Sequence, residues 1–145
     1  MQPVLFDTSI YISALRAGEE GGRALGLWAE DASVWLSAVV LEELYAGAGA
    51  RDRRAVERLE YGFDRAGSLL VPTLSDWVEA GKVLARLGAE YGYEQIGRAR
   101  LTNDALLAAS AGSRGITVIT ANERDFARLR EFAFFLYEVT TVWPA

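Results

Sequence analysis

Short apolar or β-branched runs alternate along this chain with longer segments whose apolar residues recur at helical spacing. The runs do not alternate between apolar and polar residues, which is typical of strands buried on both faces of a parallel sheet. Helices must then cover both faces, so the sequence predicts an α/β fold, a three-layer α/β/α sandwich with a mainly parallel central sheet. The runs lie at residues 4–6, 34–36, 69–71 and 117–120, and residues 132–142 are expected to supply a last extended segment.

Helix start and stop signals lie between these runs. Thr8 and Ser9 are candidate caps for a helix that begins near Ile10, and Gly21-Gly22 is expected to separate it from a second helix that runs to about Asp31. The next helix carries Glu43 and is expected to stop at residues 47–49. Further helices are predicted over 51–66, 75–91, from a Thr102-Asn103 cap to about 112, and from an Asn122 cap to 129.

Two details of these segments can be checked against a structure. The helix over 75–91 is expected to direct Trp77, Leu84, Leu87 and Tyr91 toward the core, because they recur at helical spacing. Residues 92–101 are polar and irregular, and they are expected to form a loop.

The chain has 145 residues, and we expect residues 1–145 to form a single domain around one core. Its 51% hydrophobic and 24% charged residues are typical of a folded globular protein. The amino terminus lacks the basic segment and apolar core of a signal peptide, and no apolar stretch is long enough to cross a bilayer. A cytoplasmic protein without membrane contact is therefore expected.

The net charge of -5, with Lys82 as the only lysine, argues against a protein that binds nucleic acid through bulk positive charge. A nucleic-acid substrate is not excluded, because bound cations would cancel the charge of a carboxylate site locally. We interpret the arginine stripe of the 51–66 helix as a solvated face paired with nearby glutamates. Two loop arginines fit contact with a substrate phosphate as well as they fit an ordinary surface role. The stripe is Arg51, Arg54, Arg58 and Arg65, and the loop residues are Arg98 and Arg100.

Four acidic residues stand beside the predicted strands. Each has an ordinary explanation as a turn, cap or exposed residue. Because ligand sites of open parallel sheets lie beyond the carboxyl ends of the strands, however, these acids are expected to meet at one edge, and a shared site explains all four at once. They are Asp7, Glu43, Asp104 and Asp125.

The chain contains no histidine and no cysteine, so carboxylates must carry any chemistry. Oxygen-only ligation suits Mg²⁺ or Mn²⁺. Two carboxylates about 4 Å apart repel by roughly 4 kcal/mol at an effective dielectric constant near 20, so a cluster of four needs a cation. All four acids are therefore expected to serve as metal ligands. Thr120 and Asn122 are expected to take part in binding the ion by hydrogen-bonding within its shell, and Thr8 and Ser9 add further short hydrogen-bonding groups to the same edge.

Phosphodiester hydrolysis by metal-activated water is the reaction that such a site favours. Without histidine, the imidazole-assisted route to a cyclic phosphate is closed. Two other phosphate-handling folds fit poorly: a receiver domain needs a lysine where this chain has Thr120, and a phosphatase of the haloacid dehalogenase type needs an aspartate where it has Ser9. A non-catalytic binding module stays open as an alternative, although none of the four acids is lost.

Four ordered motifs contain these acids: VLFDTS at residues 4–9, SAVVLEELYAG at 37–47, LTNDALLAA at 101–109 and TANERDF at 120–126. Together they resemble the PIN domain family, particularly the toxin ribonucleases of VapBC toxin–antitoxin pairs. In the pattern of that family the acid of the second motif directly precedes a leucine, which selects Glu43 over Glu42. Asp7 and Asp104 match the two aspartates that are the most direct Mg²⁺ ligands in the family.

The resemblance implies a Mg²⁺- or Mn²⁺-dependent endoribonuclease in which Asp7, Glu43, Asp104 and Asp125 form the catalytic and metal-binding set. It also implies an RNA substrate, a homodimer and a cognate antitoxin protein that occludes the site. PIN domains act in RNA processing outside toxin pairs as well, so a processing nuclease is an alternative.

Overall fold

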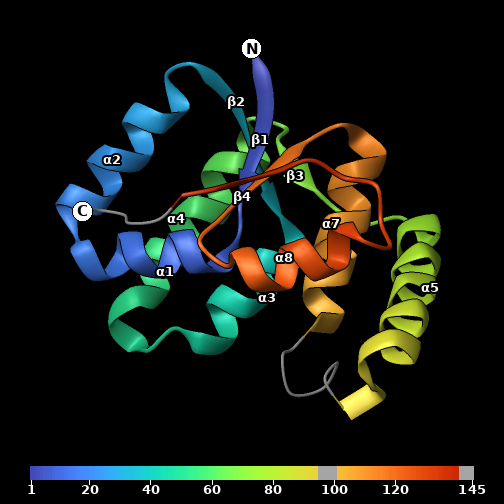
Figure 1. Ribbon diagram of the computed structural model, residues 1–145. Coiled ribbons are helices and arrows are strands. Elements are labelled where there is room, and N and C mark those ends of the chain that lie inside the picture. The colour runs from blue at the N-terminus through green and yellow to red at the C-terminus, as the bar shows by residue number, and fades with distance from the viewer. Residues whose placement is uncertain (95–100, 141–145) are drawn as a thin grey trace.

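A five-stranded parallel sheet forms the centre of the protein (Figure 1). The structure is a computed structural model that describes residues 1–94 and 101–140. The predicted parallel α/β fold is confirmed. The strands, in spatial order, are β3 (Leu69–Leu70), β2 (Ala32–Ser37), β1 (Gln2–Phe6), β4 (Thr117–Thr120) and β5 (Tyr137–Val139).

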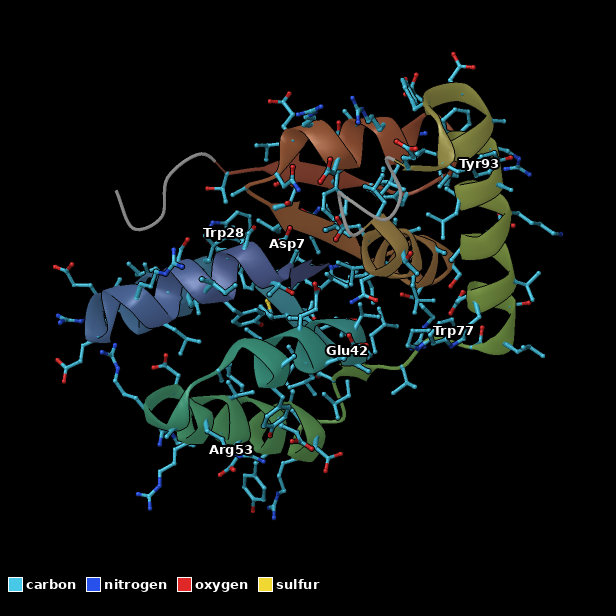
Figure 2. The ribbon with its side chains drawn as sticks, turned by 90° about the horizontal axis from the view of Figure 1, so that it is seen from below. Asp7, Trp28, Glu42, Arg53, Trp77 and Tyr93 are labelled. Carbon is cyan, nitrogen blue, oxygen red and sulfur yellow. The ribbon has the colours of Figure 1, made fainter. Side chains whose placement is uncertain are left out.

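Helices cover both faces of this sheet. The helices from the first half of the chain form one contacting group, and those from the second half form another. Right-handed crossovers in this strand order place the two groups on opposite faces of the sheet. Figure 2 shows the two groups on opposite sides of the sheet. The first group is α1 (Thr8–Ala17), α2 (Glu19–Ala29), α3 (Ala38–Gly47) and α4 (Ala50–Arg65), and the second is α5 (Leu74–Tyr91), α7 (Leu101–Arg114) and α8 (Glu123–Arg130).

The strand order reverses beside β1. From β1 the chain proceeds outward to β2 and β3, and it then returns to place β4 on the other side of β1. In open parallel sheets the crevice beyond the carboxyl ends of the two strands at such a reversal is the usual position of a ligand site. Residues that follow β1 and β4 therefore occupy the position that the topology favours for chemistry.

The core explains why the apolar runs were reliable signals. Leu5, Leu36 and Ile119 on three neighbouring strands are completely buried between the helical layers. Phe6 meets Tyr11 and Trp28 edge-to-face, with ring centroids 5.9 and 5.7 Å apart. Burial on both faces requires apolar residues at consecutive strand positions, as the sequence shows.

Two predictions about the first helices are wrong. Asp7, and not Thr8 or Ser9, is the N-cap residue of α1, because its side chain accepts a hydrogen bond from the backbone N–H of Ile10. The break falls at Gly18, whose φ of 64° favours glycine, while Gly21 and Gly22 lie inside α2. A Cβ atom at Gly21 would stand 2.0 Å from the carbonyl oxygen of Ala14, so this glycine permits close packing of α2 on α1.

The second half of the chain brings further corrections. Trp77 is 57% exposed, whereas Leu87 is buried as predicted. Thr102 and Asn103 lie inside α7, which the structure describes from Leu101 onward. The last strand is shorter than expected, and much of the loop at 92–101 lies outside the described residues. No helix within 1–94 and 101–140 combines the length and hydropathy needed to span a membrane.

Candidate active site

The four predicted acids all lie at the carboxyl edge of the sheet. Asp7 directly follows β1, and Asp125 is in the first turn of α8, just after β4. Asp104 is in the first turn of α7, and Glu43 is on α3, the helix that follows β2. Figure 2 views the molecule from this edge, and Asp7 lies between the two groups of helices. Parallel pairing thus brings together residues that are far apart in the sequence.

Asp7 is held by three hydrogen bonds at the carboxyl ends of β1 and β4. Its Oδ1 accepts hydrogen bonds from Ser9 Oγ (2.5 Å) and from the backbone N–H of Ile10 (3.4 Å). Its Oδ2 accepts one from Thr120 Oγ1 (2.5 Å), a residue that is completely buried at the end of β4. Asp7 itself is only 5% exposed, and this burial raises its pKa despite the hydrogen bonds, which act in the opposite direction.

Asp104 provides the clearest electrostatic sign of a cluster. Burial, which is the largest cause, and the negative charges of Asp7, Glu43 and Asp125 together raise its pKa from 3.8 to about 7. Within the described part of the chain, no hydrogen-bond donor contacts its carboxylate to offset these effects. The charges of the other three acids therefore act on Asp104, as expected when the four lie close together.

The neighbouring residues Glu42 and Glu43 differ in their hydrogen-bond partners. Thr8 Oγ1 donates to Glu43 Oε1 at 2.8 Å, which connects α1 with α3 beside Asp7. Asn103 Nδ2 donates to Glu42 Oε1 at 3.2 Å, and Glu42 is exposed (Figure 2). The charge that acts on Asp104 is that of Glu43. This geometry favours Glu43 as the acid of the site, as the leucine that follows it suggested.

Thr120 and Asn122 each donate a hydrogen bond to one of the aspartates, Thr120 to Asp7 and Asn122 to Asp125. Asn122 Nδ2 donates to Asp125 Oδ2 at 2.8 Å, and Asn122 Oδ1 accepts from the backbone N–H of Asp125 at 3.4 Å. Thr120 Oγ1 in turn accepts from the backbone N–H of Asn122 at 2.9 Å. Both side chains therefore contact the carboxylates, and they would act around a bound ion by orienting its ligands.

A hard divalent cation fits the chemistry of this donor set. The donors are carboxylate oxygens, and their mutual repulsion is the condition that a cation relieves. Within residues 1–94 and 101–140, no three acidic side chains converge tightly enough to form a ready ligand set. Each of Asp7, Glu43 and Asp125 accepts hydrogen bonds from hydroxyl or amide donors, and an ionised carboxylate keeps further lone pairs with which it would bind a cation.

Comparison with known families decides the identity of this arrangement. Residues 4–131 match the family model of the PIN domain. The chain belongs to the PIN domain family. A comparison with curated proteins gives no match.

Solved structures share the whole fold of this PIN domain at low sequence identity. A chain of the DNA-bound VapBC complex from Salmonella typhimurium is 22% identical, with a TM-score of 0.67 over 96% of this chain and 98% of that chain. A chain of VapBC2 from Rickettsia felis, bound to a promoter DNA fragment, is 19% identical, with a TM-score of 0.61 over 96% and 99%. A chain of FitAB bound to the IR36 DNA fragment is 20% identical, with a TM-score of 0.67 over 98% of each chain.

Some residues around the PIN domain site could not be assigned from sequence alone. Asn103 was expected to cap a helix, and its contact with Glu42 depends on how α7 packs against α3. Arg98 and Arg100, which we considered for contact with phosphate, lie outside the described residues. On α4, Arg51 of the predicted stripe pairs with Asp52 at 3.5 Å, whereas Glu57 pairs at 3.4 Å with Arg53, which is not in that stripe.

The glutamate doublet of the PIN domain supplies a matched pair of variants. If the site binds a cation and cleaves RNA as the resemblance implies, Glu43→Gln should reduce cleavage by roughly a hundredfold, because it would remove a charged ligand, whereas Glu42→Gln should leave the rate within about twofold. Initial rates on one RNA at saturating Mn²⁺ measure both effects. An essential Glu42 beside a dispensable Glu43 would show that the assignment within the doublet is reversed.

Mn²⁺ or Mg²⁺ should raise the melting temperature of this PIN domain. A ligand that binds only the folded state stabilises it by about 2.7 kcal/mol at a hundred times its dissociation constant. The ion would also relieve the repulsion around Asp104. Thermal melts across a Mn²⁺ titration measure the shift, and a melting temperature that stays constant up to millimolar Mn²⁺ would contradict the metal site.

Proposed function

We propose that this PIN domain, acting as a single domain, is a Mg²⁺- or Mn²⁺-dependent endoribonuclease. The observation that supports the proposal is the position of the four acids at the carboxyl edge of the sheet, beside the strand-order reversal, and the raised pKa of Asp104 agrees with it. Perturbed pKa values cluster at functional sites, and a bound cation would relieve this repulsion between carboxylates. Without histidine or cysteine in the chain, a phosphate-directed cation is the chemistry that these residues support best.

Each residue of the site would have its own role in binding the cation. Asp7 and Asp104 would hold the cation most directly, since Asp7 is fixed by three donors and Asp104 is free of hydrogen bonds within the described structure. Glu43 and Asp125 would complete the negative charge and orient the attacking water. Thr120 and Asn122 would keep the aspartates in place. When bound, the cation supplies activation of that water and neutralisation of charge that builds up on the phosphoryl group.

We further propose that the protein is the toxin of a VapBC-type pair, with an RNA substrate, a cognate antitoxin that covers the site, and a homodimeric state. The support is the near-complete overlap with chains of VapBC and FitAB complexes. A pair of this kind works in the cytoplasm, where the RNA is. The same site would also serve an RNA-processing nuclease, and growth experiments separate these roles. Expression of the chain alone should arrest growth, and co-expression of the protein encoded by an adjacent short gene should restore it.

Cleavage by the purified protein tests the enzymatic proposal. RNA and DNA oligonucleotides of the same sequence would be incubated with Mg²⁺, Mn²⁺ or EDTA. We expect cleavage of the RNA with either metal and none with EDTA, while the DNA stays intact. A protein that binds RNA without cutting it under any of these conditions would instead be a non-catalytic binding module.

A further inference from the structure

Thr8 occupies a position that connects two of the four acids. It is the first residue of α1 and directly follows Asp7, and its hydroxyl donates to Glu43 Oε1 at 2.8 Å. Glu43 reaches the site from α3, so this hydrogen bond joins two helices at the edge where the acids meet. Among the described residues, no other hydrogen bond involves the Glu43 side chain.

The four carboxylates differ in how firmly they are held. Asp7 receives three hydrogen bonds, and its short side chain stands on the rigid junction between β1 and α1. Glu43 has a longer side chain with more rotamers, and fixing such a side chain costs up to roughly 2 kcal/mol of conformational entropy. Within the described residues, it depends on one donor for that restraint, the hydroxyl of Thr8. Losing this donor should therefore displace Glu43 more than losing any single donor would displace Asp7.

Electrostatic repulsion makes the restraint on Glu43 more important. The charges of Glu43, Asp7 and Asp125 already act together on Asp104. A glutamate free to rotate would lower this repulsion by turning toward solvent, away from the site. Its neighbour Glu42, on another face of α3, is exposed and accepts a hydrogen bond from Asn103. The Thr8 hydroxyl opposes this outward turn.

We infer that Thr8 is a positioning residue that keeps Glu43 directed at the ion-binding site, and the inference rests on the proposed function. Thr8 does not itself bind the ion or the substrate. Its effect on metal affinity passes through Glu43, so it must disappear when Glu43 can no longer act as a charged ligand. This dependence separates positioning from a general structural role.

Calorimetric titration of Mn²⁺ into purified variants tests the inference. Thr8→Val keeps the shape of the side chain but removes the donor, and it should weaken Mn²⁺ binding about tenfold, as is usual for a group that orients a metal ligand. Thr8→Ser keeps the donor and should bind within about threefold of the unchanged protein. Asn103→Ala, the matched control, releases Glu42 and should leave Mn²⁺ binding unaltered. Thr8→Ala replaces Thr8→Val if the valine variant does not fold.

A double-mutant cycle with Glu43→Gln completes the test. In that background Thr8→Val should have no further effect on Mn²⁺ affinity, because the residue it positions is already disabled. An equal loss in both backgrounds, or a Thr8→Val variant that binds like the unchanged protein, would overturn the positioning role alone. Absence of Mn²⁺ binding by the unchanged protein would overturn both this inference and the proposed function.

Discussion

Asp104→Asn should abolish RNA cleavage while making the metal-free protein more stable. Loss of a direct ligand removes several kcal/mol of transition-state stabilisation, which corresponds to a rate reduction of roughly a thousandfold or more. Stability should change in the opposite direction, because asparagine carries no charge to be buried beside Asp7, Glu43 and Asp125. After allowance for solvent screening, the gain at pH 8 should be about 1–3 kcal/mol. Urea unfolding and initial cleavage rates measure the two effects.

Asp76→Asn is the matched control for this variant. Asp76 is also a buried carboxylate, but it forms a capping box with Thr73 at the start of α5 and accepts a hydrogen bond from Ser113 at 2.9 Å. Its replacement should destabilise the protein by about 1 kcal/mol and leave the cleavage rate unchanged. An Asp104→Asn variant that still cleaves RNA, or one that is destabilised like Asp76→Asn, would contradict the account of the site.

The metal-free protein should lose stability as the pH rises from about 4 to about 7. The pKa of Asp104 is about 7 in the folded protein, whereas the ordinary value of 3.8 applies to the unfolded chain. At a pH between these two values, the folded state binds more protons than the unfolded state. Stability therefore falls with increasing pH across this window and levels off above it. The raised pKa of Asp7 acts in the same direction. The chain has no histidine, the side chain that normally titrates in the upper part of this range.

Unfolding free energies at pH 5.5 and pH 8, with and without Mn²⁺, measure this effect. The metal-free protein should be about 1–3 kcal/mol less stable at pH 8 than at pH 5.5, because the pKa of Asp104 is raised and solvent screening reduces the effect. Asp104→Asn should remove most of the difference. Saturating Mn²⁺ should also reduce it, because the cation favours the ionised carboxylate. A metal-free protein that gains stability between pH 5.5 and pH 8 would show that the acids do not repel one another as described.

The parts of the fold that could be predicted from sequence are those that a local pattern determines. Burial on both faces imposed apolar residues on β1 and β2, and the topology rule then placed Asp7 and Asp125 at one edge. Asn122 was correctly expected to cap α8, because an asparagine before a short amphipathic segment is a strong start signal.

The errors arose where tertiary contacts override local propensity. Gly21 looked like a helix breaker, but the close approach of Ala14 explains a glycine inside α2. Trp77 lies on the apolar spacing of α5 and is nevertheless largely exposed. The same limit applies to the site, because the partner of Glu43 depends on how α1 lies against α3. The position of the four acids at one edge was predictable and their role stays a prediction, whereas the Thr8 contact was not predictable.

End-group analysis of cleaved RNA tests the central claim most directly. If carboxylate-held Mg²⁺ or Mn²⁺ directs water at the phosphorus and the 3′ oxygen leaves, the products carry a 5′-phosphate and a 3′-hydroxyl. We expect these ends with the purified protein in Mn²⁺, no cleavage in EDTA, and no cleavage by Asp104→Asn in either condition. Products that end in a 2′,3′-cyclic phosphate and still form in EDTA would contradict both the metal mechanism and the assignment of Asp7, Glu43, Asp104 and Asp125.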